Sequence, residues 1–297
     1  MNIKLIVMDM DGTLLNEDGI ITQETLEALW AVQANGILLA IASGRHPKGL
    51  IAFVKQLRMD KYGGYLIGVN GAMVVKVPEM VTLKRHLMPA SDVQDLFRFG
   101  HEMAIETLAV HDETIYNYIP SSLIESKMMY RLLNNINPAI KDTAGVWSFI
   151  QDHRKNYPVI HKIENYLDEY GSANKVCFAH EPEVMEVFYP LLQKRFSSHF
   201  NVMRTSPRWY ELSPKGIDKG SALNEVKLIL NIKTEEIMCF GDGENDLPMF
   251  AECGYPIAMA NAMPLVKEKA WALTSKNTED GIAQAIKQYD LISSSKT

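Results

Sequence analysis

The chain has 297 residues, of which 47% are hydrophobic and 22% are charged. This composition excludes disorder over the chain as a whole, because disordered chains combine low hydrophobicity with high net charge. The length favours two compact units, or one core with a large insertion. The 36 acidic residues outnumber the 30 basic residues. The resulting net charge of −6 argues against nucleic-acid binding, which depends on basic side chains that neutralise phosphates.

The three cysteines, Cys177, Cys239 and Cys253, cannot all pair with one another and form no C-x-x-C motif. We therefore expect buried thiols, and neither a disulfide framework nor a structural zinc site. The first apolar run is too short for a signal peptide, and no apolar stretch approaches the ~18 residues that a membrane helix requires. We expect a cytoplasmic protein that binds neither nucleic acid nor a membrane.

Strand and helix patterns alternate along the first part of the chain. Apolar runs typical of strands buried on both faces occupy Ile3–Met8, Ile37–Ala42 and Tyr65–Val69. The residues between these runs have helical spacing, with Thr22 as the candidate cap of one helix and Pro47 in the first turn of another. The turn signal Asn70-Gly71 follows the third strand.

The middle of the chain has a different pattern, with a denser mixture of polar and aromatic residues. Two strands are predicted at Ala104–Val110 and Thr114–Ile119, and the short polar turn between them favours a hairpin. Helices are predicted at Ser91–Phe99, Ser122–Asn134 and Pro182–Phe196. We interpret this region as an inserted α+β domain.

The last part of the chain returns to alternating strands and helices. A helix is predicted at Lys219–Leu230, with Asp218 as its cap, and a buried strand at Ile237–Phe240. Shorter apolar segments and a final helix complete the pattern, at Pro256–Ala260, Trp271–Thr274 and Asp280–Tyr289. Such alternation predicts an α/β fold with a mainly parallel sheet covered by helices on both faces.

Two carboxylates follow the first strand, in the sequence DMDGT at residues 9–13. Asp9 and Asp11 lie where open α/β sheets bind ligands, at the carboxyl end of a buried strand. Because like charges this close repel, a bound cation would explain them, and oxygen-rich clusters suit Mg²⁺. A solvated acidic turn is the alternative interpretation, and this pair by itself does not exclude it.

Two further signals suggest that an anion binds near this pair. Ser43-Gly44-Arg45 follows the second strand, where a hydroxyl and exposed amides can cradle a phosphate, although a plain helix cap has the same appearance. Lys219 begins a predicted helix, where its charge adds to the positive end of the helix dipole and favours a bound anion. Lys215 is a rival four residues earlier. We favour Lys219, because only Lys219 is tied to a helix terminus, although an exposed surface lysine remains the alternative.

A third acidic segment, GDGEND at residues 241–246, follows the Ile237–Phe240 strand. Its glycines permit a sharp turn, so a tight acidic turn is one interpretation. A calcium-binding loop is another, but the D-x-[DN]-x-[DN]-G register and the distal glutamate of such loops are absent. Taken together, the segments at 9–13, 43–45, 219 and 241–246 point to one ligand site.

The sequence resembles the phosphatases of the haloacid dehalogenase superfamily, specifically the Cof-type (IIB) group. The motifs that carry the resemblance are DMDGTLL at 9–15, SGR at 43–45, KGIDKGSAL at 215–223 and GDGENDLPM at 241–249. The resemblance implies a Rossmann-like parallel-sheet core at residues 1–86 and 210–297, with an α/β cap domain inserted at residues 87–209. The cap would hinge over the core and select the substrate.

The resemblance also implies a role for each matching residue. Asp9 would be the nucleophile that forms an aspartyl-phosphate, Asp11 the general acid and base, and Lys219 the cation that neutralises the nucleophile and the phosphate. The implied Mg²⁺ ligands and their supporting acid are Asp9, Asp11, Asp242 and Asp246. The implied phosphate contacts are the backbone amide of Met10, together with Ser43, Gly44, Lys219 and Asn245.

The resemblance predicts a Mg²⁺-dependent phosphatase that acts on small phosphorylated metabolites, and we expect sugar phosphates among them. A phosphomutase or phosphotransferase would use the same aspartyl-phosphate but pass the phosphoryl group to a sugar. A non-catalytic sensor of phosphorylated ligands is a third reading, which the presence of Asp9, Asp11, Lys219 and Asp242 disfavours. The substrate-selecting residues of the middle domain carry no comparable motif, and Arg45, His46 and Lys48 resemble ordinary surface residues.

Overall fold

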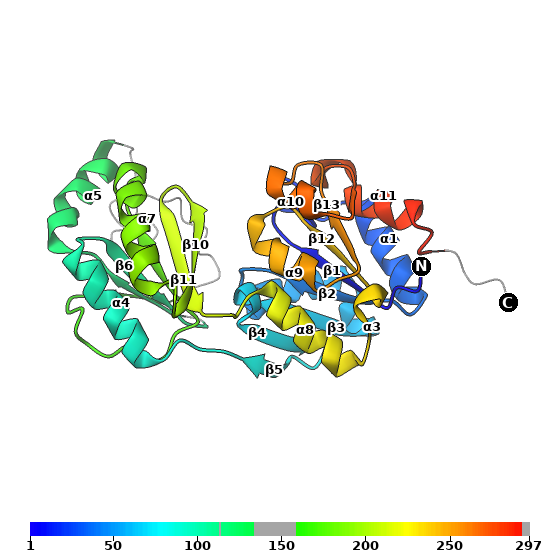
Figure 1. Cartoon of the computed structure of the whole chain (residues 1–297), viewed down its shortest axis with the longest axis horizontal. Helices are drawn as coiled ribbons and strands as arrows, with labels where there is room; N and C mark the ends of the chain where they lie inside the picture. The colour runs from blue at the N-terminus through cyan, green and yellow to red at the C-terminus, as the bar shows by residue number, and fades with distance from the viewer. Residues whose placement is uncertain (113, 134–158, 293–297) are drawn as a thin grey trace. The chain divides into compact units, whose positions relative to one another are not determined.

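The computed structural model describes residues 1–112, 114–133 and 159–292. The chain forms two compact units (Figure 1): Met1–Arg85 with Ile217–Thr297, and His86–Gly216. The second unit ends at Gly216 rather than at residue 209, because the strand Trp209–Pro214 pairs with its neighbours in the second sheet. No helix among the described residues is long and apolar enough to cross a membrane.

The first unit contains an eight-stranded sheet with the order β14-β13-β12-β1-β2-β3-β4-β5. The strands from β14 to β3 are parallel, whereas β4 and β5 are antiparallel additions at one edge. The strands are β1 (Leu5–Asp9), β2 (Leu38–Ala42), β3 (Gly64–Gly68), β4 (Met73–Val77), β5 (Val81–Arg85), β12 (Ile237–Gly241), β13 (Tyr255–Ala258) and β14 (Ala272–Leu273). The expected α/β fold with a mainly parallel sheet is confirmed.

Helices connect these strands and cover the sheet. They are α1 (Gln23–Ala34), α2 (Ile51–Gln56), α3 (Met59–Tyr62), α8 (Lys219–Leu230), α9 (Leu247–Ala251), α10 (Pro264–Lys269) and α11 (Gly281–Gln288). The single helix expected after Pro47 is instead a short 3₁₀ turn, Pro47–Leu50, followed by α2 and α3. Every residue of β1, β3 and β12 is buried, as their continuous apolar runs predict.

The second unit contains a six-stranded sheet with the order β10-β11-β9-β6-β7-β8. Its strands are β6 (Glu106–Val110), β7 (Thr114–Tyr118), β8 (Val159–Ile163), β9 (Lys175–Ala179), β10 (Phe200–Ser206) and β11 (Trp209–Pro214). The helices are α4 (Ala90–Glu102), α5 (Ser121–Leu133) and α7 (Pro182–Phe196). The expected β6–β7 hairpin is present, and Asn134, the expected end of α5, lies outside the described residues.

One hydrophobic core joins α4 and α7 to the sheet of the second unit. Phe99 of α4 stacks on Phe188 of α7 with ring centroids 5.5 Å apart, and both rings approach Phe178 of β9. Burial of such large aromatic side chains supplies much of the stability of a domain this size. The three cysteines of the chain are buried thiols, as expected: Cys177 lies in the second unit, and Cys239 and Cys253 lie in the first.

Candidate active site

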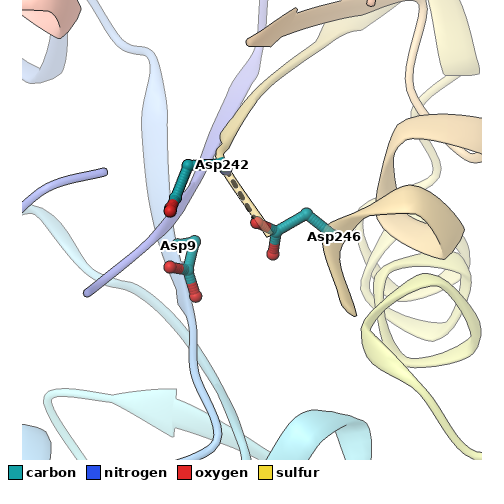
Figure 2. Close-up of side chains that lie close together, drawn as sticks. All are labelled: Asp9, Asp242 and Asp246. Carbon is teal, nitrogen blue, oxygen red and sulfur yellow. Dashed lines mark hydrogen bonds between the residues drawn. The ribbon is translucent and has the colours of Figure 1, made fainter. Parts of the chain in front are cut away.

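Three acidic side chains meet at the carboxyl edge of the first sheet. Asp9 is the last residue of β1, and Asp242 directly follows β12, which pairs with β1 in parallel. Asp246 ends the 3₁₀ turn Glu244–Asp246 and reaches back toward both (Figure 2). Each of the three offers a carboxylate oxygen, and these oxygens lie within 4.8 Å of one another. Parallel strands bring their carboxyl ends to one edge of the sheet, which explains how distant segments of the chain converge here.

Asp246 is fully buried and shapes the loop around it. Its Oδ2 accepts hydrogen bonds from the backbone N–H groups of Asp242, at 3.0 Å, and Gly243, at 3.1 Å. Figure 2 shows the first of these bonds as a dashed line. The glycine-rich sequence at 241–246 therefore forms a tight turn, and this turn places Asp242 and Asp246 beside Asp9.

Lys219 is the cation of this cluster. It begins α8 behind the cap residue Asp218, whose carboxylate accepts the N–H of Ser221 at 2.8 Å. Its ammonium group donates one hydrogen bond to Asp9 and another, 2.6 Å long, to Asp246. Lys215, the rival in the sequence, belongs to the second unit and donates to the backbone carbonyl of Ser197. Of these two lysines, the structure brings only Lys219 to the acidic residues.

Burial perturbs the titration of the cluster. It raises the pKa of Asp9 to about 7, against the opposing effect of the Lys219 ammonium. It also raises the pKa of Asp242 to about 6, although the hydroxyl of Thr13 donates a 2.7 Å hydrogen bond to that carboxylate. Burial lowers the pKa of Lys219, but the nearby carboxylates of Asp9 and Asp246 outweigh it and raise the pKa above its ordinary value. Burial thus disfavours the ionised forms of Asp9 and Asp242, even with the Lys219 ammonium nearby.

The donor chemistry fits a divalent metal ion. Carboxylate oxygens are the ligands that hard divalent cations prefer, and the cluster of Asp9, Asp242 and Asp246 supplies three of them within reach of one another. One ammonium group faces three carboxyl groups, so a second positive charge would favour the ionised carboxylates and oppose the effect of burial on the pKa values of Asp9 and Asp242.

Asp11 lies apart from this cluster. Its side chain is 64% exposed and forms a two-pronged ion pair with Arg45, whose Nε lies 3.1 Å from Oδ2 while Nη2 donates to Oδ1. The carboxylate of Asp11 therefore lies outside the cluster of Asp9, Asp242 and Asp246, because the Arg45 guanidinium holds it on the exposed side. The role of Asp11 as a Mg²⁺ ligand stays a prediction. Arg45 is accordingly more than an ordinary surface residue.

The other expected phosphate-contacting residues lie on separate loops that follow β1, β2 and β12. Ser43 directly follows β2 and is buried, and its Oγ accepts the N–H of Arg45 at 3.1 Å, which leaves the hydroxyl proton available for a ligand. The side chain of Met10 is fully buried, so only its backbone can face a ligand. The side chain of Asn245 folds over Gly243, where an added Cβ would lie 2.5 Å from its Oδ1. Gly44 separates Ser43 from Arg45 at the same edge.

Sequence reasoning assigned no role to three residues that shape this site. Thr13 orients Asp242 through the hydrogen bond described above. Gly12 has a φ of +85°, and a Cβ on it would lie 2.3 Å from Oδ2 of Asp242. Asn261 donates a 2.8 Å hydrogen bond to the carbonyl of Gly12. Gly12 and Thr13 belong to the DMDGT motif, so their place in that motif could have indicated a role in the site. Nothing in the sequence near Asn261 indicates that it bonds to Gly12.

The comparison with protein families accounts for nearly the whole chain. Residues 6–286 match the family described as haloacid dehalogenase-like hydrolase. The chain belongs to this family. This match confirms the resemblance seen in the sequence motifs. It also confirms the expected enzyme class, because the family description names a hydrolase.

Individual members of the haloacid dehalogenase-like family are similar over their full length. The 5-amino-6-(5-phospho-D-ribitylamino)uracil phosphatase YcsE of Bacillus subtilis is 28% identical, over 98% of this chain and 97% of YcsE. The phosphatase YwtE of the same organism, which carries the same substrate name, is also 28% identical, over 96% and 97%. A crystal structure of a haloacid dehalogenase-like hydrolase from Bacteroides thetaiotaomicron, 28% identical, superposes with a TM-score of 0.75 over 97% of this chain and 99% of that chain.

Proposed function

We propose that this chain is a Mg²⁺-dependent phosphatase that hydrolyses small phosphorylated metabolites, with sugar phosphates and related phosphorylated polyols as the substrate class. The observation that carries the proposal is the buried contact between Asp9 and Lys219 beside Asp242 and Asp246. A nucleophile, a cation and further metal-binding oxygens are the parts that phosphoryl transfer needs. The similarity to relatives named as phosphatases of a phosphorylated ribityl compound supports the same class.

The proposed reaction begins at Asp9. One oxygen of its carboxylate attacks the phosphorus of the substrate, so that a new oxygen–phosphorus bond forms while the bond from phosphorus to the substrate alcohol breaks. Lys219 and the loop of Ser43 and Gly44 hold the phosphoryl oxygens during this step. Asp11 donates a proton to the departing alcohol. Its exposed position places its carboxylate on the solvent side of the edge, from which a substrate arrives.

In the second half of the proposed reaction the aspartyl-phosphate is hydrolysed. Asp11, now ionised, removes a proton from a water molecule, which attacks the phosphorus and releases inorganic phosphate and the free carboxylate of Asp9. Asp9, Asp242 and Asp246, with the backbone of Asp11, would hold the Mg²⁺ ion, which supplies positive charge to the phosphoryl oxygens. We assign the inserted unit, residues 86–216, the role of a cap that selects the leaving group.

The proposal is tested by the release of inorganic phosphate from a panel of phosphorylated sugars, polyols and nucleotides. We expect release with Mg²⁺, none in excess chelator, and a fall of several orders of magnitude in Asp9→Asn, which removes the nucleophile with almost no change of shape. Full activity in chelator, or a double-digit percentage of wild-type turnover in Asp9→Asn, would refute the mechanism. Transfer to a second sugar without phosphate release would indicate a mutase, and binding without either reaction would indicate a sensor.

A further inference from the structure

The loop after β3 has an unusual backbone. Val69, Asn70 and Gly71 all have positive φ angles, of 52°, 51° and 101°. Asparagine and glycine adopt the left-handed region readily, but a β-branched valine does so rarely, because its side chain clashes with the backbone there. Unfavourable backbone of this kind persists only where the surroundings impose it, and it is concentrated at functional sites.

The surroundings of this loop are the neighbouring loops of the candidate active site. The N–H of Val69 donates to the carbonyl of Arg45, and the N–H of Asn70 donates to the carbonyl of Ser43, each at 3.0 Å. Gly71 lies against Asp218, the cap of α8, so closely that a Cβ on Gly71 would come within 2.0 Å of the Asp218 carbonyl oxygen. The loop is therefore fixed between the segment that carries Ser43 and the helix that begins with Lys219.

The consequence is a defined position for the Asn70 side chain. A Cβ built on Gly44 would lie 3.3 Å from both Nδ2 and Oδ1 of Asn70, so the amide rests directly on Gly44 of the expected phosphate cradle. Any side chain on Gly44 would crowd this amide. The absence of one lets the two loops approach each other, and it leaves the Gly44 backbone and the Asn70 amide side by side.

The Asn70 amide has polar capacity that the protein does not use. Its Oδ1 is buried and has no hydrogen-bond partner among the residues that the structure describes. Asn70 as a whole is only half-buried, so the amide is not sealed from a ligand. Nδ2, the donor atom of the same amide, makes no hydrogen bond among the described residues and is not one of the buried unpaired atoms, so it can reach a ligand oxygen, whereas Oδ1 can only accept.

We propose that Asn70 is a phosphoryl-binding residue, whose amide nitrogen donates a hydrogen bond to an oxygen of the tetrahedral anion cradled by Ser43 and Gly44. The assignment rests on the proposed function, because it concerns the same site. The ligand class is a phosphate monoester or inorganic phosphate. The left-handed backbone holds the amide in place before the ligand binds, which avoids the cost of ordering it afterwards.

The test measures the binding of inorganic phosphate in the presence of MgCl₂ by titration calorimetry. Asn70→Gly removes the amide but keeps a residue that tolerates positive φ. Asn70→Asp keeps the shape and also tolerates this backbone, but it replaces the donor by a negative charge. The matched control is Asn231→Gly, because Asn231 ends α8 with a φ of 51° and is exposed to solvent.

We expect Asn70→Gly to raise the Kd of phosphate by about tenfold and Asn70→Asp to raise it by roughly a hundredfold, since the first loses a hydrogen bond to an anion and the second adds repulsion. Asn231→Gly should leave the Kd unchanged. A purely structural Asn70 would instead give folded variants with the wild-type Kd, and that result overturns the assignment. Loss of folding in both Asn70 variants would overturn it as well, because the amide would then serve the fold.

The result for Asn70 can be told apart from the result for the proposed phosphatase activity. A wild-type protein that binds phosphate but releases none from any ester would defeat the phosphatase proposal, whereas the Kd values of the variants would still decide the role of Asn70. A wild-type protein that binds no phosphate would overturn the assignment directly. Reduced turnover in Asn70→Gly with an unchanged Kd for phosphate would count against it too.

Discussion

Lys219 Nζ lies 2.6 Å from Asp246 Oδ1, and both side chains are fully buried. The same ammonium group also pairs with Asp9, so a single lysine holds together residues from β1, α8 and the turn after β12. A buried ion pair is poor evidence for net stability, but removal of one partner leaves an uncompensated buried charge. Lys219 is consequently important for folding at neutral pH, and the proposed function gives it the further role of holding a phosphoryl group.

Lys219→Met should lower the free energy of unfolding by about 3–5 kcal/mol near pH 8, because the carboxylates of Asp9 and Asp246 would lose their partner. The loss should be smaller near pH 5, because burial raises the pKa of Asp9 to about 7 and its carboxyl group is then protonated. Denaturant unfolding at the two pH values measures both effects. Lys215→Met is the matched control, since the ammonium group of Lys215 donates to the Ser197 carbonyl at an exposed site and its loss should change stability little.

The double variant Lys219→Met/Asp246→Asn separates the two roles of the lysine. It removes one of the uncompensated charges and should recover part of the lost stability, because replacement of both partners of a buried pair is often nearly neutral. Phosphate binding should not recover, since the cation is still missing. A double variant that regains phosphate affinity as well would show that Lys219 acts only through the fold.

Asp11→Asn should separate the two halves of the proposed reaction. With a substrate whose leaving group needs no proton from Asp11, the aspartyl-phosphate on Asp9 should accumulate, because no base activates water, and release of the leaving group should stop after a burst of about one turnover. Intact-mass spectrometry of protein quenched in acid would detect the added phosphoryl group. Wild-type steady-state turnover in Asp11→Asn would contradict the role of Asp11.

Arg45→Met should lower turnover less than Asp11→Asn does, because Arg45 forms an ion pair with Asp11 and would act only through it. Lys48→Met is the control, since Lys48 is exposed and close to Arg45 in the sequence.

The raised pKa values of Asp9 and Asp242 predict how the stability of the metal-free protein depends on pH. In the unfolded chain both carboxyl groups ionise near pH ~4, whereas in the folded protein burial raises their pKa values to about 7 and about 6. As the pH rises between these limits, the unfolded chain loses its protons first. The free energy of unfolding should therefore fall across this window and level off above it.

Thermal unfolding in chelator at about pH 5 and pH 8 measures this effect. The melting temperature of the wild type should drop more between the two values than that of Asp242→Asn, which has one titrating group fewer. Added Mg²⁺ should raise the melting temperature more at the higher pH, because metal binding requires ionised carboxylates. Equal drops in wild type and Asp242→Asn would show that Asp242 is not responsible.

The sequence predicts those parts of the fold in which a short run of residues favours one kind of structure. Continuous apolar runs at the positions of β1 and β12 could only be buried strands, and the acidic and glycine-rich segments after them had to share an edge of the sheet. Lys219 was distinguished from Lys215 by its position at a helix start, and α8 does begin there.

Other features depend on contacts that no local pattern encodes. The edge strand β5 was missed because its residues are exposed or only half-buried, so it lacks the apolar signal of its neighbours. The Asp11–Arg45 pair joins side chains from two neighbouring loops, and each residue taken alone is an ordinary exposed charge. The left-handed Val69 contradicts local preference, and only the packing against Arg45 and Asp218 explains it.

The close approach of Gly12 to Asp242 yields a prediction about metal binding that has an internal control. Gly12 and Gly19 both have positive φ angles, of 85° and 72°, so alanine should strain the backbone at either position. A Cβ on Gly12 would lie 2.3 Å from Oδ2 of Asp242, whereas a Cβ on Gly19 would meet nothing within 4 Å. Both variants should lose about 1–2 kcal/mol of stability from the backbone alone.

Only Gly12→Ala should also weaken metal binding, because the Asp242 carboxylate would have to leave its place beside Asp9. We expect the Mg²⁺ concentration for half-maximal thermal stabilisation to rise by about tenfold or more in Gly12→Ala and to stay at the wild-type value in Gly19→Ala. Equal Mg²⁺ dependence in the two variants would mean that the position of Asp242 does not control the metal site. A shift in Gly12→Ala alone would connect the glycine of the first motif to the aspartate of the last, through the contact that their two strands bring about.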